Sequence, residues 1–205
     1  MLKAEIRNQV LKERISLSEQ EYNRLSESLL NQFKTLDFSA VKTIHIFLPI
    51  IEKKEPNTFL LIEWLTENHS EIKIIVPKAD FGTTLMTNHE YLGLNDLQKN
   101  LYNILEPQKG NIHDGEIEMV LIPLLAVDKQ GYRVGYGKGF YDRFLENINA
   151  QKIGLSLSSV IEKIDDVNKH DIRLDLCITP IEIINFKQSW QPKSLSKLKN
   201  NTKTI

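Results

Sequence analysis

Residues 119–145 read MVLIPLLAVDKQGYRVGYGKGFYDRFL, and this stretch decides the fold class of the chain. It opens with a run of apolar side chains, which is typical of a buried strand. Four of the nine glycines in the chain then fall between Gly131 and Gly139. A helical pattern follows, in which Phe140 and Phe144 are four residues apart. The stretch therefore predicts a strand, a glycine-rich loop and a helix in direct succession.

Similar short apolar runs recur on both sides of this unit. They are near-continuous rather than alternating, which indicates strands covered on both faces, as in the parallel sheet of an α/β protein. We expect these strands at residues 44–48, 72–76, 119–122, 152–157 and 174–178. We expect helices in two pieces over residues 2–35 with a break near 16–18, and at 59–68, 94–101 and 138–147, with a short hairpin or edge insertion at 82–91.

Composition narrows the range of functions. The chain has 205 residues, 41% of them hydrophobic, so we expect one domain. Its net charge is −1, so we expect no overall electrostatic field that favours nucleic acid or an anionic membrane. The single cysteine, Cys177, excludes an intrachain disulfide. There is no apolar run of spanning length and no signal-peptide order at the N-terminus, so we expect a cytoplasmic protein. We interpret residues 183–205 as a lysine-rich, partly disordered C-terminal tail.

The glycine-rich loop suits an anionic ligand. Glycine permits positive φ and leaves backbone N–H groups unshielded, so several amides can point at one anion beside the positive end of the following helix. Arg133 and Lys138 add full positive charges. The spacing matches neither G-x-x-x-x-G-K-[ST] nor G-x-G-x-x-G, so it predicts an anion-binding loop without naming the anion. The alternative is a tight turn that happens to be rich in glycine.

Residues 133–142, RVGYGKGFYD, resemble the signature of the 5-formyltetrahydrofolate cyclo-ligases, also called methenyltetrahydrofolate synthetases. The flanks are similar too, with Ile122-Pro123 and Asp128 upstream and Arg143 downstream. The resemblance covers residues 3–179. It implies a cyclo-ligase domain over residues 1–182, with a three-layer, mostly parallel α/β sandwich that is NagB/RpiA/CoA transferase-like. It also implies an enzyme that uses ATP to convert 5-formyltetrahydrofolate to 5,10-methenyltetrahydrofolate.

The first expected helix carries a pair of cations. Lys3 and Arg7 are four residues apart and share one face, which by itself is more often a solvated face than a binding site. The family begins with a Lys-x-x-x-Arg pair that contacts ATP, and these two residues match it. The ATP contacts that the resemblance implies are Lys3, Arg7, Arg133, Val134, Gly135, Tyr136, Gly137, Lys138, Gly139, Phe140 and Tyr141.

The resemblance also implies folate contacts. The loop after the strand expected at 44–48 lies beyond the carboxyl end of a parallel strand, where such sheets bind ligands. The family has a leucine at the end of this strand and a glutamate a few residues later, matched here by Leu48 and Glu55. Glu52 is a rival for the glutamate, and Glu55 could instead complement the dipole of the next helix. The other implied folate contacts are Tyr136, Gly137, Lys138, Gly139 and Phe140.

Two aspartates are implied as magnesium ligands. Asp142 by itself reads as an acid that complements a helix dipole, but family members use this aspartate and another near the C-terminus, matched here by Asp171. His170 is a neighbour rather than a ligand, because imidazole is a poor magnesium ligand. Two carboxylates with phosphate oxygens and waters form a normal magnesium shell. We expect small-molecule substrates, ATP and 5-formyltetrahydrofolate, and a monomer that binds neither nucleic acid nor membrane.

Two other functions fit the same residues. A sugar-phosphate isomerase or related transferase has a similar sheet and anion-binding loops, but it needs no ATP. A non-catalytic nucleotide-binding regulator binds ATP without consuming it when reduced folate is added. Likeness of fold does not choose between these functions, whereas the long loop signature favours the cyclo-ligase.

Overall fold

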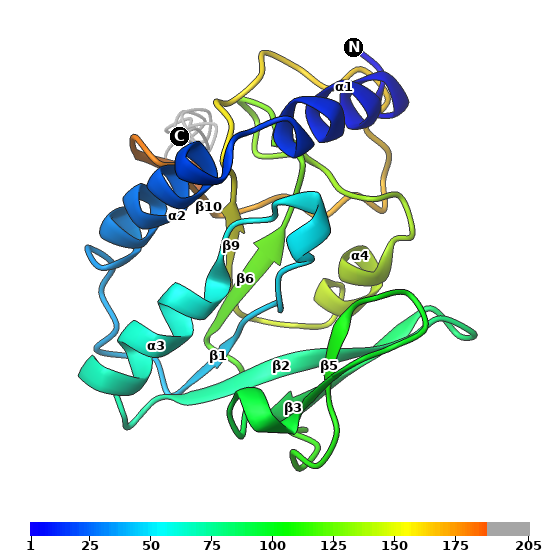
Figure 1. Ribbon diagram of the computed structural model, residues 1–205. Helices are drawn as coiled ribbons and strands as arrows, with labels where there is room; N and C mark the ends of the chain where they lie inside the picture. Colours follow the sequence, from blue (N-terminus) through cyan, green and yellow to red (C-terminus); the bar gives the residue numbers. More distant parts are fainter. Residues whose placement is uncertain (188–205) are drawn as a thin grey trace, which may run out of the picture.

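The computed structural model describes residues 1–187, and its centre is a seven-stranded sheet (Figure 1). Five strands are parallel, and the two at the edges pair antiparallel with their neighbours. In order across the sheet, the strands are β11 (Ile183–Asn185), β10 (Leu176–Ile178), β9 (Gln151–Leu155), β6 (Met119–Pro123), β1 (Thr43–His45), β2 (Lys73–Asp80) and β3 (Leu85–Glu90).

Helices cover both faces of the sheet. On one face lie α2 (Glu19–Phe33) and α3 (Thr58–Asn68), and on the other lies α4 (Phe140–Leu145). At the end of the sheet, α1 (Lys3–Ile15) packs against β7 (Ala126–Val127) and β8 (Arg133–Val134) (Figure 1). The other short elements are η1 (Ile51–Lys53), η2 (Leu94–Asp96), β4 (Leu97–Lys99) and β5 (Leu105–Pro107). The predicted α/β class with a mostly parallel sheet is therefore confirmed.

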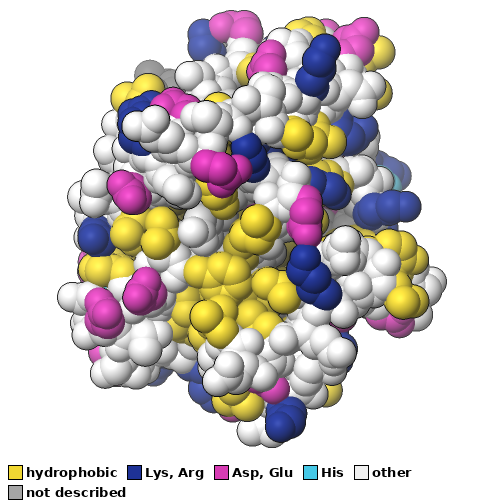
Figure 2. All heavy atoms as spheres, in the orientation of Figure 1, with side chains coloured by type: hydrophobic (Ala, Val, Ile, Leu, Met, Phe, Trp, Pro, Cys, Tyr) yellow, Lys and Arg dark blue, Asp and Glu magenta, His cyan; other side chains and the backbone are white. Residues whose placement is uncertain are grey.

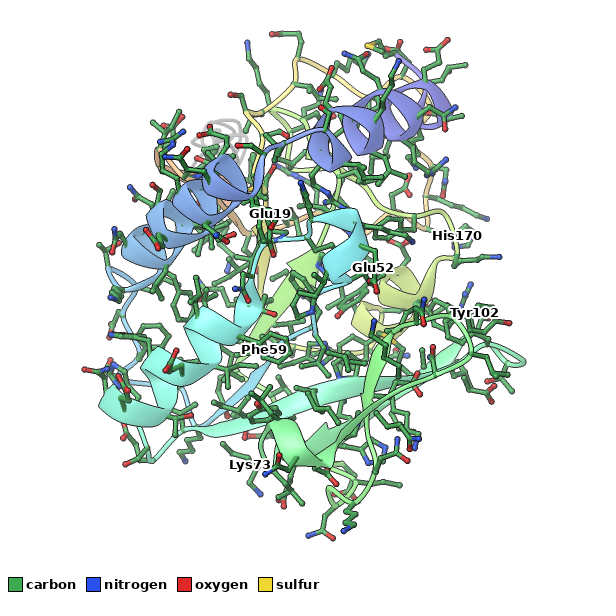
Figure 3. The ribbon with its side chains drawn as sticks, in the orientation of Figure 1. Glu19, Glu52, Phe59, Lys73, Tyr102 and His170 are labelled. Carbon is green, nitrogen blue, oxygen red and sulfur yellow. The ribbon has the colours of Figure 1, made fainter. Side chains whose placement is uncertain are left out.

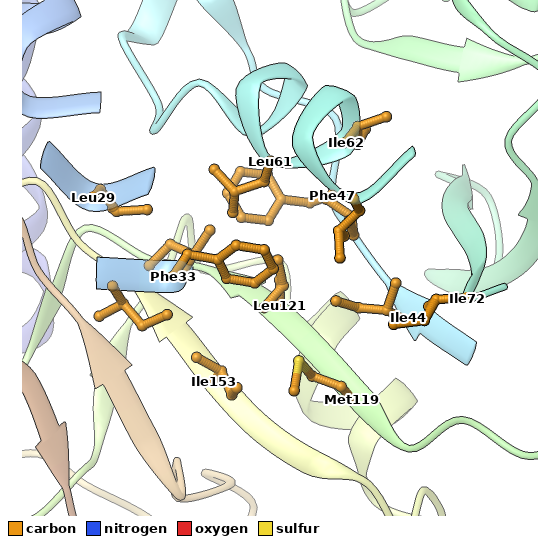
Figure 4. Packing of buried hydrophobic residues seen from close by; sticks show 14 of the residues in the cluster. Leu29, Phe33, Ile44, Phe47, Leu61, Ile62, Ile72, Met119, Leu121 and Ile153 are labelled. Carbon is orange, nitrogen blue, oxygen red and sulfur yellow. The ribbon is translucent and has the colours of Figure 1, made fainter. Parts of the chain in front are cut away.

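The core has two halves because successive side chains of a strand point to opposite faces. In β6, Met119 and Leu121 belong to the cluster beneath α2 and α3, where they pack with Phe33 (Figure 4). Val120 and Ile122 belong to the cluster beneath α4. Both faces of this strand are thus apolar, which explains why its sequence is near-continuously hydrophobic.

The break between the first two helices is confirmed. α1 ends at Ile15, and the Ser18 hydroxyl oxygen caps α2 by accepting the Glu21 backbone N–H at 3.1 Å. Of the two alternatives expected at 82–91, a short hairpin or an edge insertion, the structure has a hairpin, in which β2 and β3 pair antiparallel across a turn at residues 81–84. Cys177 is a buried free thiol in β10. These local predictions depended on caps, turns and apolar runs that lie close together in the sequence.

The helix expected over residues 94–101 is wrong. Only the single 3-10 turn η2 forms there, and the chain then enters β4, which pairs with β5. The Asp96 carboxylate accepts the backbone N–H groups of Lys109 and Gly110 at 2.9 and 3.3 Å. The turn is thereby tied to a segment that lies after β5, and this tertiary contact favours a hairpin over a helix.

Several boundaries also differ from those expected. The helix expected at 138–147 is shorter, and the strand expected at 44–48 pairs only over β1, although residues 46–48 stay buried. Beyond residue 182 the chain enters β11, which pairs with β10, so the sheet continues past the expected domain boundary. Residues 188–205 of the expected tail lie outside the described residues. Among residues 1–187, no helix is both long and apolar enough to span a membrane.

The strand order identifies where a ligand site belongs. From β1 the chain crosses through α3 to β2, whereas from β6 it crosses through α4 to β9, on the other side of the sheet. β1 and β6 are neighbours, so the connections diverge between them. Open α/β sheets bind ligands beyond the carboxyl ends of the strands at such a switch point. The segments that follow these two strands, residues 46–57 and 124–139, contain the predicted folate glutamate and the glycine-rich loop.

Candidate active site

The glycine-rich loop runs from the β7–β8 hairpin to the start of α4. Gly137 and Gly139 have φ values of 88° and 69°, which residues with a Cβ rarely adopt. A Cβ on Gly137 would also lie 3.2 Å from Nη2 of Arg7. Glycine at this position therefore allows both the bend of the loop and its close contact with a cation from α1.

α1 brings two predicted cations to the site. Arg7 Nε donates to the Gly135 carbonyl oxygen at 2.8 Å. Lys3 Nζ forms an ion pair with Asp171 at 2.5 Å, and each of these two side chains is only 16% exposed. This face of α1 therefore contacts the protein instead of solvent, and it joins the loop to the segment that carries Asp171.

The two cations of the loop itself have different environments. The Arg133 side chain is only 5% exposed, and its two Nη nitrogens donate to Asp142 at 2.7 Å and to the Ile172 carbonyl at 2.6 Å. Lys138 is exposed, and none of the acidic side chains of residues 1–187 pairs with it. Lys138 is thus available to an anionic ligand, whereas the buried Arg133 side chain stabilises the loop through its hydrogen bonds to Asp142 and Ile172.

The two predicted magnesium ligands lie on segments that contact each other. The Asp142 carboxylate accepts the backbone N–H of Ile172 at 3.4 Å, so it lies beside the residue that follows Asp171. Each aspartate faces a cation, Arg133 for Asp142 and Lys3 for Asp171. Across the described residues there is no group of three or more His, Cys, Asp or Glu side chains that could hold a metal by itself.

Glu55 is buried beside the loop. It is 2% exposed, its carboxylate accepts the backbone N–H of Ile50 at 2.7 Å, and the Tyr136 hydroxyl lies beside it. Burial raises the pKa of Glu55, while the Ile50 N–H, the Tyr136 hydroxyl and the charges of Arg14 and Lys53 hold that rise back. A buried carboxylate held by donors is a group prepared to accept hydrogen bonds from a ligand.

Glu52, the rival of Glu55, lies at the surface on η1 (Figure 3). It forms an ion pair with Lys99 at 2.7 Å, with both side chains about half exposed, and that lysine lowers the pKa of Glu52. Leu48 and Val134 are 5% and 0% exposed in hydrophobic clusters. The geometry therefore favours Glu55 over Glu52 as the candidate folate contact. Because the Val134 side chain is buried, mainly its backbone is left to contact a ligand.

Two residues near the site were missed from the sequence. Arg14 is buried at the end of α1 and donates to the Tyr136 hydroxyl oxygen. It lies seven residues after Arg7, a spacing that places both on one helix face, and this signal could have found it. His45 is the second, a polar side chain at the end of β1, directly before the buried apolar residues 46–48. A polar residue in a buried strand is the signal by which His45 could have been identified from the sequence.

His45 connects β1 to the helix that follows the loop. Its Nδ1 lies 2.9 Å from Oδ1 of Asn88, and its Nε2 lies 3.1 Å from the hydroxyl of Tyr141. Burial lowers the pKa of His45 to about 4, so the ring is neutral at physiological pH. A neutral ring fits this network if Nδ1 donates to Asn88 and Nε2 accepts from Tyr141. The contact fixes the first turn of α4, next to Asp142.

Aromatic side chains line the outer edge of the site. The Phe140 ring contacts Phe81 with centroids 5.2 Å apart, and Phe81 contacts Tyr102 at 4.0 Å. Tyr102 is 60% exposed (Figure 3). On the face shown in Figure 2, Lys and Arg side chains lie next to a continuous patch of hydrophobic side chains. Flat rings and anionic groups could both be held on such a surface.

Fold and site together define a class: an α/β protein whose glycine-rich loop and cations meet at the switch point of a mostly parallel sheet. Residues 1–180 match the model of the 5-formyltetrahydrofolate cyclo-ligase family, so the chain belongs to this family and is an enzyme, a cyclo-ligase. The predicted resemblance is thereby confirmed.

Similar proteins carry the same names. The chain is 29% identical to a 5-formyltetrahydrofolate cyclo-ligase of Mycoplasma pneumoniae, over 87% of this chain and 98% of that one. It is 28% identical to the mouse cyclo-ligase, over 80% and 87%. The solved structure of Aquifex aeolicus 5,10-methenyltetrahydrofolate synthetase has a TM-score of 0.81 at 29% identity, covering 97% of this chain and all of that one.

Proposed function

We propose that the protein converts 5-formyltetrahydrofolate to 5,10-methenyltetrahydrofolate, with ATP as co-substrate and ADP and phosphate as products. The observation that carries this proposal is the meeting of three segments at the switch point. These are the cationic face of α1, the glycine-rich loop with its exposed Lys138, and the loop that holds Glu55. One side of the site suits a polyphosphate and the other suits a neutral ring with N–H donors.

The chemistry explains why ATP is needed. The oxygen of an N-formyl group is a poor leaving group, so it is phosphorylated before the ring closes. This oxygen attacks the γ-phosphorus of ATP, ADP leaves, and an N5-iminium phosphate forms. N10 adds to the activated carbon and loses its proton, phosphate departs with the oxygen, and the methenyl cation remains. The attacking oxygen carries no proton, so the first step depends on alignment and charge neutralisation instead of a general base.

The phosphate side of the reaction falls to the loop and α1. Lys138 is exposed and has no acidic partner among residues 1–187, so it can neutralise charge on the transferred phosphoryl group. Arg7 lies against Gly137 and reaches the same loop, where backbone N–H groups can point at phosphate oxygens. Arg133 acts from within the protein, because its bonds to Asp142 and the Ile172 carbonyl hold the loop against α4 and the segment before β10.

The donor set near Arg133 fits magnesium. Asp142 and Asp171 offer hard carboxylate oxygens on adjoining segments, with side chains 32% and 16% exposed. Magnesium takes one or two carboxylates and completes its shell with phosphate oxygens and water. When bound with ATP, the ion would neutralise negative charge on the phosphates. The two aspartates would hold it beside the loop.

The folate side falls to Glu55 and the residues that cover it. Its carboxylate can accept N–H groups from a pterin ring, which carries several such donors. Because Glu55 is only 2% exposed, the side chains around it would shift to admit the folate, while the Tyr136 hydroxyl stays bound to Arg14. Tyr136 lies between Gly135 and Gly137, and glycines on both sides give this part of the backbone more freedom than other residues would.

The direct test mixes the protein with ATP, magnesium and 5-formyltetrahydrofolate, and follows methenyl absorbance together with ADP. We expect one ADP for each methenyl product. Product without ADP, or ADP without methenyl product, would contradict the proposal. Omitting the folate tests a regulator that only binds ATP, and omitting ATP tests an isomerase.

A matched pair of lysine variants tests the role of the loop. Lys138→Ala should lower kcat by about 10²–10³-fold, as when one donor to a developing charge is removed. The fold should be intact, because Lys138 is exposed and no described acid depends on it. The control is Lys73→Ala at the start of β2, away from the carboxyl ends of the strands (Figure 3). Wild-type turnover in Lys138→Ala would refute the assignment of this lysine.

A further inference from the structure

Arg14 joins the three segments that form the site. It belongs to α1, is 4% exposed, and uses all three guanidinium nitrogens as donors. Nε donates to the Lys53 carbonyl at 2.8 Å and Nη1 to the Leu124 carbonyl at 3.1 Å. Nη2 donates to the hydroxyl oxygen of Tyr136. One side chain of α1 thus contacts the loop after β1, the segment after β6 and the glycine-rich loop.

The buried charge of Arg14 lacks a direct ion pair. No carboxylate in residues 1–187 forms a salt bridge with it. A buried charge is costly unless it is compensated by hydrogen bonds or an opposite charge. The opposite charge nearby is Glu55, which lies beside the Tyr136 hydroxyl and is stabilised as an anion by the positive charge of Arg14. The Tyr136 phenol therefore lies between Arg14 and Glu55.

The direction of this hydrogen-bond chain is determined by chemistry. An arginine side chain only donates, so the Tyr136 oxygen accepts from Arg14, and its own hydrogen is left to donate to the carboxylate beside it. The Glu55 carboxylate also accepts the Ile50 N–H. An ionised carboxylate has about four acceptor positions, so some remain for a ligand. All of them accept, and none donates.

We propose that Arg14 is a positioning residue for the folate: it fixes the Tyr136 hydroxyl and the Lys53 carbonyl beside the Glu55 carboxylate, which accepts ligand N–H groups. This inference rests on the proposed function, since it assumes that Glu55 contacts the folate. Arg14 itself touches neither substrate nor reacting atoms. Its effect reaches the ligand only through Tyr136 and Glu55.

The pH dependence of binding distinguishes this role from a purely structural one. Burial raises the pKa of Glu55, and the donors around it counteract the rise. Removing a donor therefore moves the pKa further up, and folate affinity is lost at a higher pH as the solution is acidified. A structural defect would weaken binding at every pH alike. The charged or titratable side chains that face Glu55 are Arg14 from α1, Tyr22 from α2, Lys53 from η1, Tyr136 from the loop and Tyr141 from α4.

The experiment compares wild type, Arg14→Lys, Tyr136→Phe and the double variant in the full-length chain. Calorimetry measures the affinity for 5-formyltetrahydrofolate without ATP, from acidic to alkaline pH. Each single variant should weaken folate binding about tenfold or more at neutral pH, as expected for a hydrogen bond to a charged group. In both single variants, the pH at which folate affinity falls on acidification should be higher than in wild type. The double variant should be no weaker than the weaker single variant, because both changes break one chain.

The matched control is Arg24→Lys, an exposed arginine of α2 that, within residues 1–187, pairs only with Glu21 of its own helix. Circular dichroism and thermal melting check that each variant is folded, and Tyr136→Phe keeps the ring if Arg14→Lys is unstable. Two results would overturn the role of Arg14. One is an unchanged pH at which folate affinity falls, and the other is a loss of affinity in the double variant that equals the product of the two single losses. Wild type that binds 5-formyltetrahydrofolate without turning it over would overturn the proposed function alone.

Discussion

His45 makes the stability of the protein depend on pH in a predictable direction. The ring is fully buried between Asn88, Tyr141 and Phe144. Burial lowers its pKa from 6.5 to about 4. Between these values the unfolded chain binds a proton that the folded chain excludes. The stability is therefore intact above about pH 6.5 and is lost as the pH falls toward about 4.

The magnitude follows from the size of the shift. A difference of about 2.5 pKa units, at 1.36 kcal/mol per unit, corresponds to about 3 kcal/mol of unfolding free energy. Typical domains have only about 5–15 kcal/mol in total, so the loss is large enough to measure. It should also loosen α4, because protonated Nε2 can no longer accept from the hydroxyl of Tyr141.

The assay is urea unfolding of wild type and His45→Gln at a series of pH values. Gln does not titrate, and the contributions of all other groups cancel in the difference between the two proteins. The advantage of wild type over the variant should shrink by about 3 kcal/mol from about pH 7 to about pH 4. A difference that stays constant over this interval would refute the assignment of a buried, neutral histidine.

Four further substitutions test the loop, the core and the buried acid. Gly137→Ala should cost about 1–3 kcal/mol in stability through its positive φ and should raise KM for ATP, because the new Cβ meets Arg7. Gly135→Ala, whose Cβ meets nothing within 4 Å, should cost less in the same urea titration. Gly154→Ala should cost about 1–3 kcal/mol by overpacking, since its Cβ would lie 2.6 Å from two leucine side chains; no change in the urea midpoint would contradict the packing. Glu55→Gln should weaken folate binding about tenfold or more without lowering the melting temperature at neutral pH, because burial raises the pKa of this carboxylate and its ionised form costs stability.

Several features could be predicted from the sequence because they depend on neighbouring residues. The strand, glycine-rich loop and helix of residues 119–145 follow from apolar runs, from glycines that permit positive φ, and from helical spacing. The helix break before Ser18 follows from its capping hydroxyl. The long signature in the loop also named the family. None of these steps required knowledge of which distant segments meet.

The partners of the site residues could not be predicted in this way. Residues 168 positions apart form the pair of Lys3 with Asp171, and 122 positions separate Arg14 from Tyr136. Spacing in the sequence leaves such contacts open, because they depend on how the chain returns across the sheet. The short hairpin of β4 and β5 was missed for the same reason, since Asp96 binds a segment beyond it.

The sequence by itself thus determined the class of fold, the family and the loop, since backbone conformation and apolar periodicity are local properties. Only the tertiary structure decided that Glu55 is buried and Glu52 is not. It also decided that the buried Arg133 side chain forms an ion pair within the protein while Lys138 remains exposed. The physical reason is that burial and charge pairing are set by what packs around a side chain. For these residues the surrounding groups come from separate elements that meet at the carboxyl ends of β1 and β6.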